Sequence, residues 1–184
     1  MKFTPQSIKD VILIEPTLHG DDRGYFIETF RQDLLEKTIG YKVNFVQDNE
    51  SKSLKGVLRG LHYQLPPYTQ AKLVRVIEGS VLDVVVDIRK SSPTFGQHVS
   101  LELTAQNKNQ LFVPHGFAHG FVVLTDSATF AYKVDNYYAP EHDRGIAFDD
   151  EQLKIDWQLS AEDLQLSDKD KTHPTLENTK DLFE

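Results

Sequence analysis

Two histidine-bearing segments, a lysine and a tyrosine carry side chains able to accept or donate protons or to bind anions. They are residues 59–64 and 114–120, Lys72 and Tyr132. A neutral imidazole accepts a proton near neutral pH, a phenol keeps its proton there, and arginine or lysine binds negative oxygen atoms. Taken singly, each has an ordinary structural explanation, such as a hydrogen-bonded histidine beside a strand or a core tyrosine. Their combination in one chain is what indicates a site.

Arg59 and His62 stand three residues apart, so a regular strand would turn their side chains to opposite faces. Both can reach one pocket only if the backbone is irregular between them. Gly60 permits a bulge at that point because glycine tolerates backbone conformations that other residues avoid. We therefore expect a broken strand at Gly60.

Residues 81–88 have the pattern of a strand that separates an apolar layer from a polar cavity. Every second residue from Leu82 to Ile88 is apolar, whereas the other face carries Asp83 and Asp87 between valines. An edge exposed to water would also explain the second face. A ligand-holding barrel requires the first arrangement, in which the apolar face packs against a second sheet and the mixed face lines the cavity.

The elements that must position these residues are short, and most have the length and composition of strands. Turn residues separate them, including Gly79 and the loop 91–96. Only residues 31–38 and 160–166 have helical character. The expected strands are residues 11–14, 25–30, 43–47, 72–77, 81–88, 99–103, 111–113, 117–124 and 128–134. We predict an all-β fold, a sandwich or barrel with a few short helices.

Length and composition limit the classes of protein. The 184 residues predict one domain, 1–184, with residues 172–184 as a peripheral tail, and the 39% hydrophobic content excludes a disordered chain. Because the net charge is −8, nucleic acid is not an expected partner. The absence of cysteine excludes disulfides and thiol catalysis. No run of apolar residues is long enough to cross a membrane, and we expect a cytoplasmic protein.

The two histidine segments resemble the two motifs of the cupin superfamily. The matching positions are Gly60, His62, Glu78 and Gly79 for the first motif and Pro114, Gly116 and His119 for the second. Metal-binding cupins generally use a His-x-His pair, but here Gln64 replaces the second histidine, and an amide is a poor metal ligand. The resemblance therefore implies a metal-free cupin, which is a jelly-roll β-barrel.

Within that superfamily, motifs from residues 3 to 176 resemble the dTDP-4-dehydrorhamnose 3,5-epimerase family. In chain order they are Arg23-Gly24-Tyr25-Phe26-x-Glu28, Gln47-x-Asn49, Arg59-Gly60-Leu61-His62-Tyr63-Gln64, Lys72, Pro114-x-Gly116-x-x-His119-Gly120, Tyr132 and Leu166-Ser167-x-Lys169-Asp170. The resemblance implies an isomerase without a cofactor. It also implies a homodimer whose N-terminal segments contribute to the partner's sheet and site.

The resemblance assigns roles residue by residue. His62 would be the catalytic base, Tyr132 the proton donor, and Asp170 the carboxylate behind His62, with Asp168 close enough to be an alternative. Lys72 would stabilise an enolate. The dTDP-sugar would be bound by Arg23, Phe26, Glu28, Gln47, Asn49, Arg59, Lys72, Asp83, His119, Tyr138, Asp143 and Lys169. Asp143 stands where the family commonly has glutamate.

The family's substrate is dTDP-4-dehydro-6-deoxy-glucose, whose hydrogens at carbons 3 and 5 lie next to a ketone. Inversion requires a base on one face and an acid on the other, which a histidine and a tyrosine can supply. Three alternatives remain open: an enzyme that inverts one carbon only or isomerises the ketone, a sugar-nucleotide-binding module without catalysis, and a metal-dependent dioxygenase. Gln64 makes the dioxygenase the weakest of them.

Overall fold

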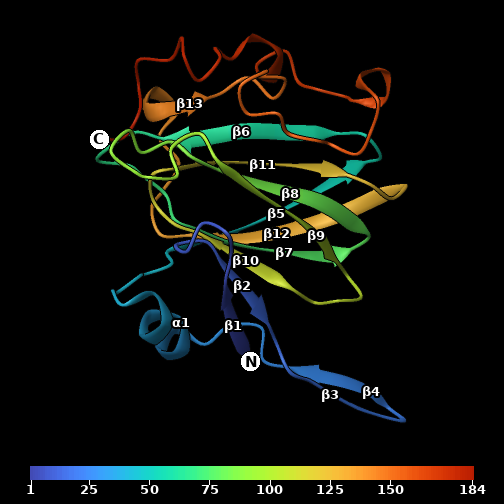
Figure 1. Ribbon diagram of the computed structural model, residues 1–184. Helices are drawn as coiled ribbons and strands as arrows, with labels where there is room; N and C mark the ends of the chain where they lie inside the picture. The colour runs from blue at the N-terminus through green and yellow to red at the C-terminus, as the bar shows by residue number, and fades with distance from the viewer.

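Two antiparallel sheets lie face to face in the computed structural model, which describes residues 1–184 (Figure 1). The six-stranded sheet has the order β1-β2-β10-β7-β12-β5. Its strands are β1 (Lys2–Pro5), β2 (Ile12–Glu15), β10 (Gln110–Val113), β7 (Lys72–Glu78), β12 (Ser127–Val134) and β5 (Gln47–Leu54). The prediction of an all-β fold is confirmed, and no helix is long and apolar enough to cross a membrane.

The second sheet has five strands in the order β13-β6-β11-β8-β9. They are β13 (Asp143–Gly145), β6 (Leu58–Gln64), β11 (Phe117–Val123), β8 (Ser80–Asp87) and β9 (His98–Thr104). Strands β3 (Leu18–Asp21) and β4 (Gly24–Ile27) form a separate hairpin, which we call the arm. The arm projects away from both sheets (Figure 1).

Side chains from both sheets meet in an apolar core between them. Phe121 of β11 and Phe130 of β12 stack there with ring centroids 4.2 Å apart. Val81 and Val85 reach this core from β8, on the same face of the strand as Asp83. The mixed face of residues 81–88 therefore faces the interior between the sheets, as expected for a barrel that encloses a polar cavity.

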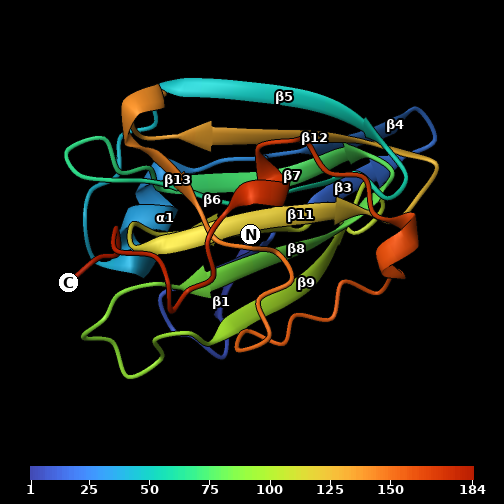
Figure 2. The same ribbon diagram turned by 90° about the horizontal axis from the view of Figure 1, so that it is seen from above.

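The apolar face of β8 lies on the other side, and here the expectation of a second sheet was wrong. Leu82, Val84 and Val86 pack beneath the C-terminal segment, which crosses the outer face of the five-stranded sheet (Figure 2). Leu176 belongs to the same cluster and is 5% exposed, although we expected residues 172–184 to be peripheral. Irregular backbone with well-spaced apolar side chains covers this face as a sheet would.

The outer face of the six-stranded sheet is covered in part by α1 (Gln32–Ile39), where a helix was predicted. The helix ends at Gly40, whose positive φ of 83° suits glycine. The second predicted helix, residues 160–166, is wrong, since the chain makes only a single 3-10 turn there. The 3-10 turns are η1 (Pro140–His142), η2 (Ala161–Asp163) and η3 (Asp170–Thr172).

One edge of the six-stranded sheet is β5, which departs from the strand expected at residues 43–47. Residues 43–46 are irregular, and the strand begins at Gln47. Each residue of β5 is a Cα partner of one in β12, so that Asn49 is opposite Tyr132. This pairing places a polar strand beside the one that carries Tyr132.

Candidate active site

A cavity of about 190 Å³ lies between the two sheets and collects the central residues predicted from the sequence. Its lining comes from β5, β6, β7, β11 and β12, and consists of Ser51, Arg59, His62, Lys72, His119, Phe121, Phe130 and Tyr132. The two phenylalanines form its apolar wall, and the remaining side chains are polar. The cavity is therefore suited to a small polar ligand that is held and oriented by a few groups.

Arg59 and His62 line the same cavity because β6 is irregular between them. Gly60 has a φ of 142°, and the pairing of β11 with β6 shifts register between His119 and Phe121. A Cβ on Gly60 would lie 2.5 Å from the Cα of Gly120, so the two strands approach too closely for any side chain. The predicted break in the strand at Gly60 is confirmed.

The imidazole of His62 is hydrogen-bonded to a buried carboxylate from the C-terminal segment. Its Nε2 lies 2.5 Å from Oδ1 of Asp170, which is 4% exposed. Asp168 points to solvent beside Lys171, so of the two candidate aspartates it is Asp170 that contacts His62. An ionised carboxylate accepts from Nε2–H, which leaves Nδ1 of His62 as the nitrogen with a free lone pair.

The environment keeps this imidazole neutral. Burial lowers the pKa of His62, and the positive charges of Lys72 and Lys169 act in the same direction, against the hydrogen bond to Asp170. Burial would raise the pKa of Asp170, but its close contacts with the His173 and His62 imidazoles outweigh that effect and hold the pKa well below its usual range. The pair is thus a neutral imidazole beside a carboxylate, the protonation state that a general base requires.

Lys72 and His119 approach the cavity from opposite sheets. Burial lowers the pKa of Lys72 to about 8, while the negative charges of Asp83 and Asp143 oppose that shift. Nε2 of His119 lies 2.9 Å from a carboxylate oxygen of Asp83, which is fully buried. Asp83 therefore holds His119 in place, whereas its effect on Lys72 is electrostatic.

Tyr132 faces the cavity from the six-stranded sheet, whereas His62 belongs to the five-stranded sheet. Burial raises the pKa of the Tyr132 phenol, although Arg59 acts in the opposite direction. The hydroxyl therefore keeps its proton at neutral pH. The His62 imidazole and the Tyr132 phenol thus reach one cavity from two different sheets, an arrangement that could act on opposite faces of a ligand.

Polar residues at the mouth of the cavity are connected to one another. Asp143 accepts a hydrogen bond of 3.1 Å from the hydroxyl of Tyr138 and pairs with Lys169. The amide of Gln47 donates to Asn49 at 2.7 Å on β5. A second hollow of about 330 Å³ begins at Arg59 and His62 and extends to Lys169 and Asp170. Lys169 thus links Asp143 and Tyr138 to the hollow that begins at His62, while Gln47 and Asn49 lie on β5, beside the strand that carries Tyr132.

Three predicted site residues are not brought to this cavity in their own chain. Arg23 and Phe26 lie on the arm, where Arg23 pairs with Asp21 and Phe26 is 67% exposed. Glu28 follows the arm and lies 3.7 Å from Arg31. The arm projects from the opposite end of the molecule to the C-terminal segment that carries Asp170 (Figure 1).

Gln64 stands at the position of a metal ligand in metal-binding cupins, but in this chain its side chain binds backbone groups. The side-chain amide of Gln64 donates to the backbone oxygens of Tyr68 and Tyr137, and its oxygen accepts from Ala139 N. Glu78 pairs with Lys52 at the surface. His62, Asp170 and His173 have ligand-type atoms within 4.8 Å of one another, but the 2.5 Å contact between His62 and Asp170 leaves no room for an ion between them.

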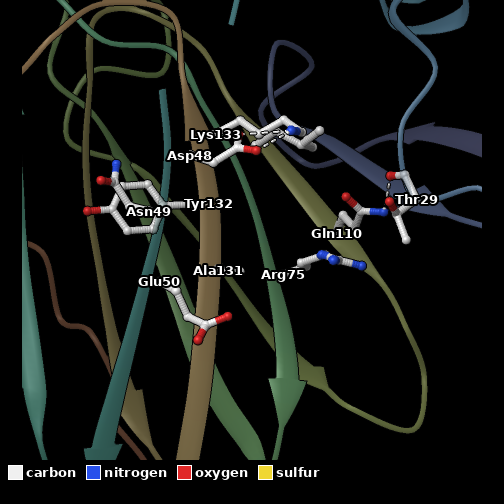
Figure 3. A pocket seen from close by; sticks show the side chains of 10 residues that line it. Thr29, Asp48, Asn49, Glu50, Arg75, Gln110, Ala131, Tyr132 and Lys133 are labelled. Atoms are coloured by element: carbon white, nitrogen blue, oxygen red, sulfur yellow. Dashed lines mark hydrogen bonds and ion pairs between the residues drawn. The ribbon is translucent and has the colours of Figure 1, made fainter. Parts of the chain in front are cut away.

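Two features were not predicted from the sequence: His173, and a polar hollow of about 440 Å³ on the outer face of the six-stranded sheet. Figure 3 shows Tyr132 and Asn49 on one side of β12, and Arg75 and Gln110 on the other. The signal for His173 was its place three residues after Asp170, within reach of the same carboxylate across one turn. Nothing in the sequence pattern distinguished the outer hollow from an ordinary polar face.

The two-sheet barrel with its polar cavity is that of a cupin-type isomerase. A family model described as dTDP-4-dehydrorhamnose 3,5-epimerase matches residues 5–178, and the chain belongs to this family. A dTDP-4-dehydrorhamnose 3,5-epimerase of Shigella flexneri is 55% identical over 170 residues, which are 92% of this chain and 93% of the relative. The resemblance found in the sequence motifs is confirmed.

Solved structures agree with this assignment. A dTDP-6-deoxy-D-glucose-3,5-epimerase of Legionella pneumophila Philadelphia 1, in complex with dTDP-4-keto-L-rhamnose, has a TM-score of 0.93 at 49% identity, over 97% of this chain and 94% of that one. A 3'-monoepimerase of Streptomyces bikiniensis, in complex with dTDP-quinovose, has a TM-score of 0.86 at 36% identity, over 94% of this chain and 87% of that one. The fold is therefore shared by epimerases of both types, while the double epimerase is the more similar in sequence.

Proposed function

We propose that the chain converts dTDP-4-dehydro-6-deoxy-α-D-glucose to dTDP-4-dehydro-β-L-rhamnose by inverting carbons 3 and 5, without a cofactor. One observation carries the proposal. A neutral imidazole backed by a carboxylate and a protonated phenol face one cavity from opposite sheets, and the ammonium group of Lys72 lines the same cavity. This set matches the needs of proton removal and return next to a ketone.

Nδ1 of His62 takes the proton from the carbon next to the ketone, and the C–H electrons move into the enolate. Asp170 stabilises the imidazolium that forms, through the bond to Nε2. The ammonium group of Lys72 stabilises the negative charge on the enolate oxygen, a contribution of about 3–4 kcal/mol per donor in comparable sites. The hydroxyl of Tyr132 then delivers a proton to the opposite face, and exchange with water restores both groups.

The nucleotide would be bound at the mouth of the cavity. Arg59 and Lys169 supply positive charge there for the diphosphate, despite the negative charge of the whole chain. Gln47, Asn49 and Tyr138 offer amides and an aromatic ring for the thymidine or the sugar. The bound dTDP-sugar in the Legionella relative supports this class of ligand.

A second copy of the chain would supply the missing contacts. Arg23, Phe26 and Glu28 lie on or beside an arm that projects from its own barrel, and Tyr25 and Phe26 expose more than half of their surface there. An exposed apolar hairpin is readily covered by another protein surface. We propose a homodimer in which each arm reaches the cavity of the partner.

Deuterium exchange tests the activity. Purified protein is incubated with the 4-keto sugar nucleotide in D2O, and exchange and configuration at carbons 3 and 5 are followed by NMR. Exchange and inversion at both carbons are expected. Reaction at one carbon only would identify a mono-epimerase, and binding without exchange would identify a non-catalytic sugar-nucleotide-binding protein.

Mixing two inactive variants tests the exchange of arms. One variant carries His62→Ala with an intact arm, and the other carries Arg23→Ala and Phe26→Ala with an intact cavity. If the arm serves the partner, a mixed dimer contains one complete site, so subunit exchange should restore activity. If mixing restores none while size measurements show mixed dimers, each arm serves its own chain.

A further inference from the structure

A second imidazole shares the carboxylate that supports His62. Nε2 of His173 lies 3.4 Å from Oδ1 of Asp170, the same oxygen that lies 2.5 Å from Nε2 of His62. The two rings are arranged edge to face, with centroids 5.6 Å apart. The sequence motifs and the proposed mechanism leave His173 without a role.

His173 is held tightly in this place. Its side chain is 10% exposed, and its Nε2 is buried with no hydrogen bond of good geometry. The ring lies directly on Gly145, since a Cβ added there would come within 2.4–2.5 Å of three ring atoms. Gly145 is itself the Cα partner of His62. Pro174, the residue after His173, accepts a backbone hydrogen bond from Ala147. The ring thus fills the space between the β13 backbone and Asp170.

We infer that His173 is a positioning residue, which holds the Asp170 carboxylate against His62 and takes a share of its negative charge. A nitrogen that is buried beside a carboxylate has no better partner there than that carboxylate. If His173 is removed, Asp170 directs its whole charge toward His62. The protonated form of His62 is then favoured, and the base is lost at a higher pH than in the wild type. The inference rests on the proposed function of His62 as the base.

Other charges around the three groups stay in place when His173 is changed. Lys72 of β7 and Lys169 before η3 both favour neutral His62. Asp143 of β13 pairs with Lys169, and Asp83 of β8 is bound to His119 of β11. Arg59 shares the cavity from β6, and Ser167 Oγ accepts a hydrogen bond from the backbone N–H of Asp170. None of these groups forms a hydrogen bond or ion pair with His173, so their contributions should largely cancel in a comparison of variants.

Three variants test the inference: His173→Leu removes the polar ring, His173→Gln restores a donor, and Gly145→Ala pushes the ring away. In His173→Leu, the acid limb of kcat/KM should move to higher pH, so that deuterium exchange at pH 6 falls several-fold while that at pH 7.5 stays within about twofold of wild type. The NMR titration of the His62 ring should move in the same direction. His173→Gln should restore part of both shifts.

The Gly145 variant supplies the decisive comparison. Gly145→Ala should reproduce the shift alone and add nothing in the His173→Leu background, because both changes act on one contact. If His173→Leu lowers the melting temperature while the His62 titration and the pH profile stay unchanged, His173 only fills space and the inference is overturned. If wild-type protein shows no exchange but the titration moves, the proposed function fails and the link from His173 to His62 stands.

Discussion

His62 and His119 are Cα partners across β6 and β11, yet their imidazoles are bound to carboxylates from different parts of the chain. His62 contacts Asp170 of the C-terminal segment, and its side chain is 29% exposed. His119 contacts Asp83 of the neighbouring strand, and its side chain is 7% exposed. Two paired positions in the sheet therefore hold two cavity-lining imidazoles, of which His62 is the more exposed and His119 is held by a carboxylate from the neighbouring strand.

His62→Ala should abolish deuterium exchange at both carbons and leave dTDP binding largely intact, because the base is lost while the charged groups at the mouth remain. The expected rate loss is at least about 100- to 10,000-fold. NMR in D2O and a binding titration measure the two effects. His115→Ala is the matched control, since His115 is exposed and pairs with Asp135 outside the cavity. Exchange of His62→Ala at near the wild-type rate would contradict the mechanism.

Tyr132→Phe should separate exchange from inversion. His62 still removes the proton and Lys72 still holds the enolate, but without the hydroxyl the proton returns mostly to the face it left. In D2O, loss of substrate hydrogen should therefore outpace net epimerisation, most clearly at carbon 5. Tyr137→Phe is the control, because Tyr137 is 63% exposed. An equal fall in both rates would show that Tyr132 only positions the sugar.

The pH profile of exchange should have an acid limb and a basic limb, which arise from the titration of two different residues. His62 must be neutral, and its lowered pKa places the acid limb below the usual range of histidine. Lys72 must be charged, and with a pKa of about 8 it loses its proton above that pH, which gives the basic limb. Lys72→Arg keeps its charge at higher pH, so the basic limb should move upward even if the rate falls. An unmoved limb would assign it to another group.

Activity in excess EDTA should equal that of untreated protein. The reason is that Gln64 replaces a histidine ligand of metal-binding cupins, and its side-chain amide is hydrogen-bonded to backbone groups of residues 68, 137 and 139. The measurement is the exchange rate before and after chelation. Loss of activity that iron, manganese or zinc restores would overturn the metal-free interpretation.

The sequence predicted what depends on local pattern. The alternation around Asp83 gave the correct interior face of its strand, and Gly60 marked the break that brings Arg59 and His62 together. In contrast, β5 reads Gln-Asp-Asn-Glu-Ser-Lys-Ser-Leu, without apolar alternation, because an edge strand needs only backbone pairing with β12. Backbone pairing leaves no trace in side-chain pattern, so this strand was placed too early.

Long-range placement was beyond the same patterns. The distance between Arg23 and His62 depends on the direction of the arm, which no residue type encodes. The C-terminal segment was undervalued because it lacks regular structure, although Leu176 is buried and Asp170 is in contact with His62. Whether Asp168 or Asp170 contacts His62 depends on the orientation of the turn at residues 167–172, and in the structure it is Asp170.

His62 and Tyr132 lie on separate sheets, so the distance between their side chains depends on how far apart the two sheets are. Phe121 and Phe130 come from the two sheets, stack with ring centroids 4.2 Å apart and line the cavity, so their packing contributes to the distance between His62 and Tyr132. A smaller side chain at Phe130 would change this packing, including the contact with the Tyr132 ring, whose centroid lies 6.0 Å away, and so alter the gap. Under the proposed mechanism, the ratio of inverted product to returned substrate would therefore respond to packing in the core, and core mutations would lower stereochemical fidelity before they unfold the protein.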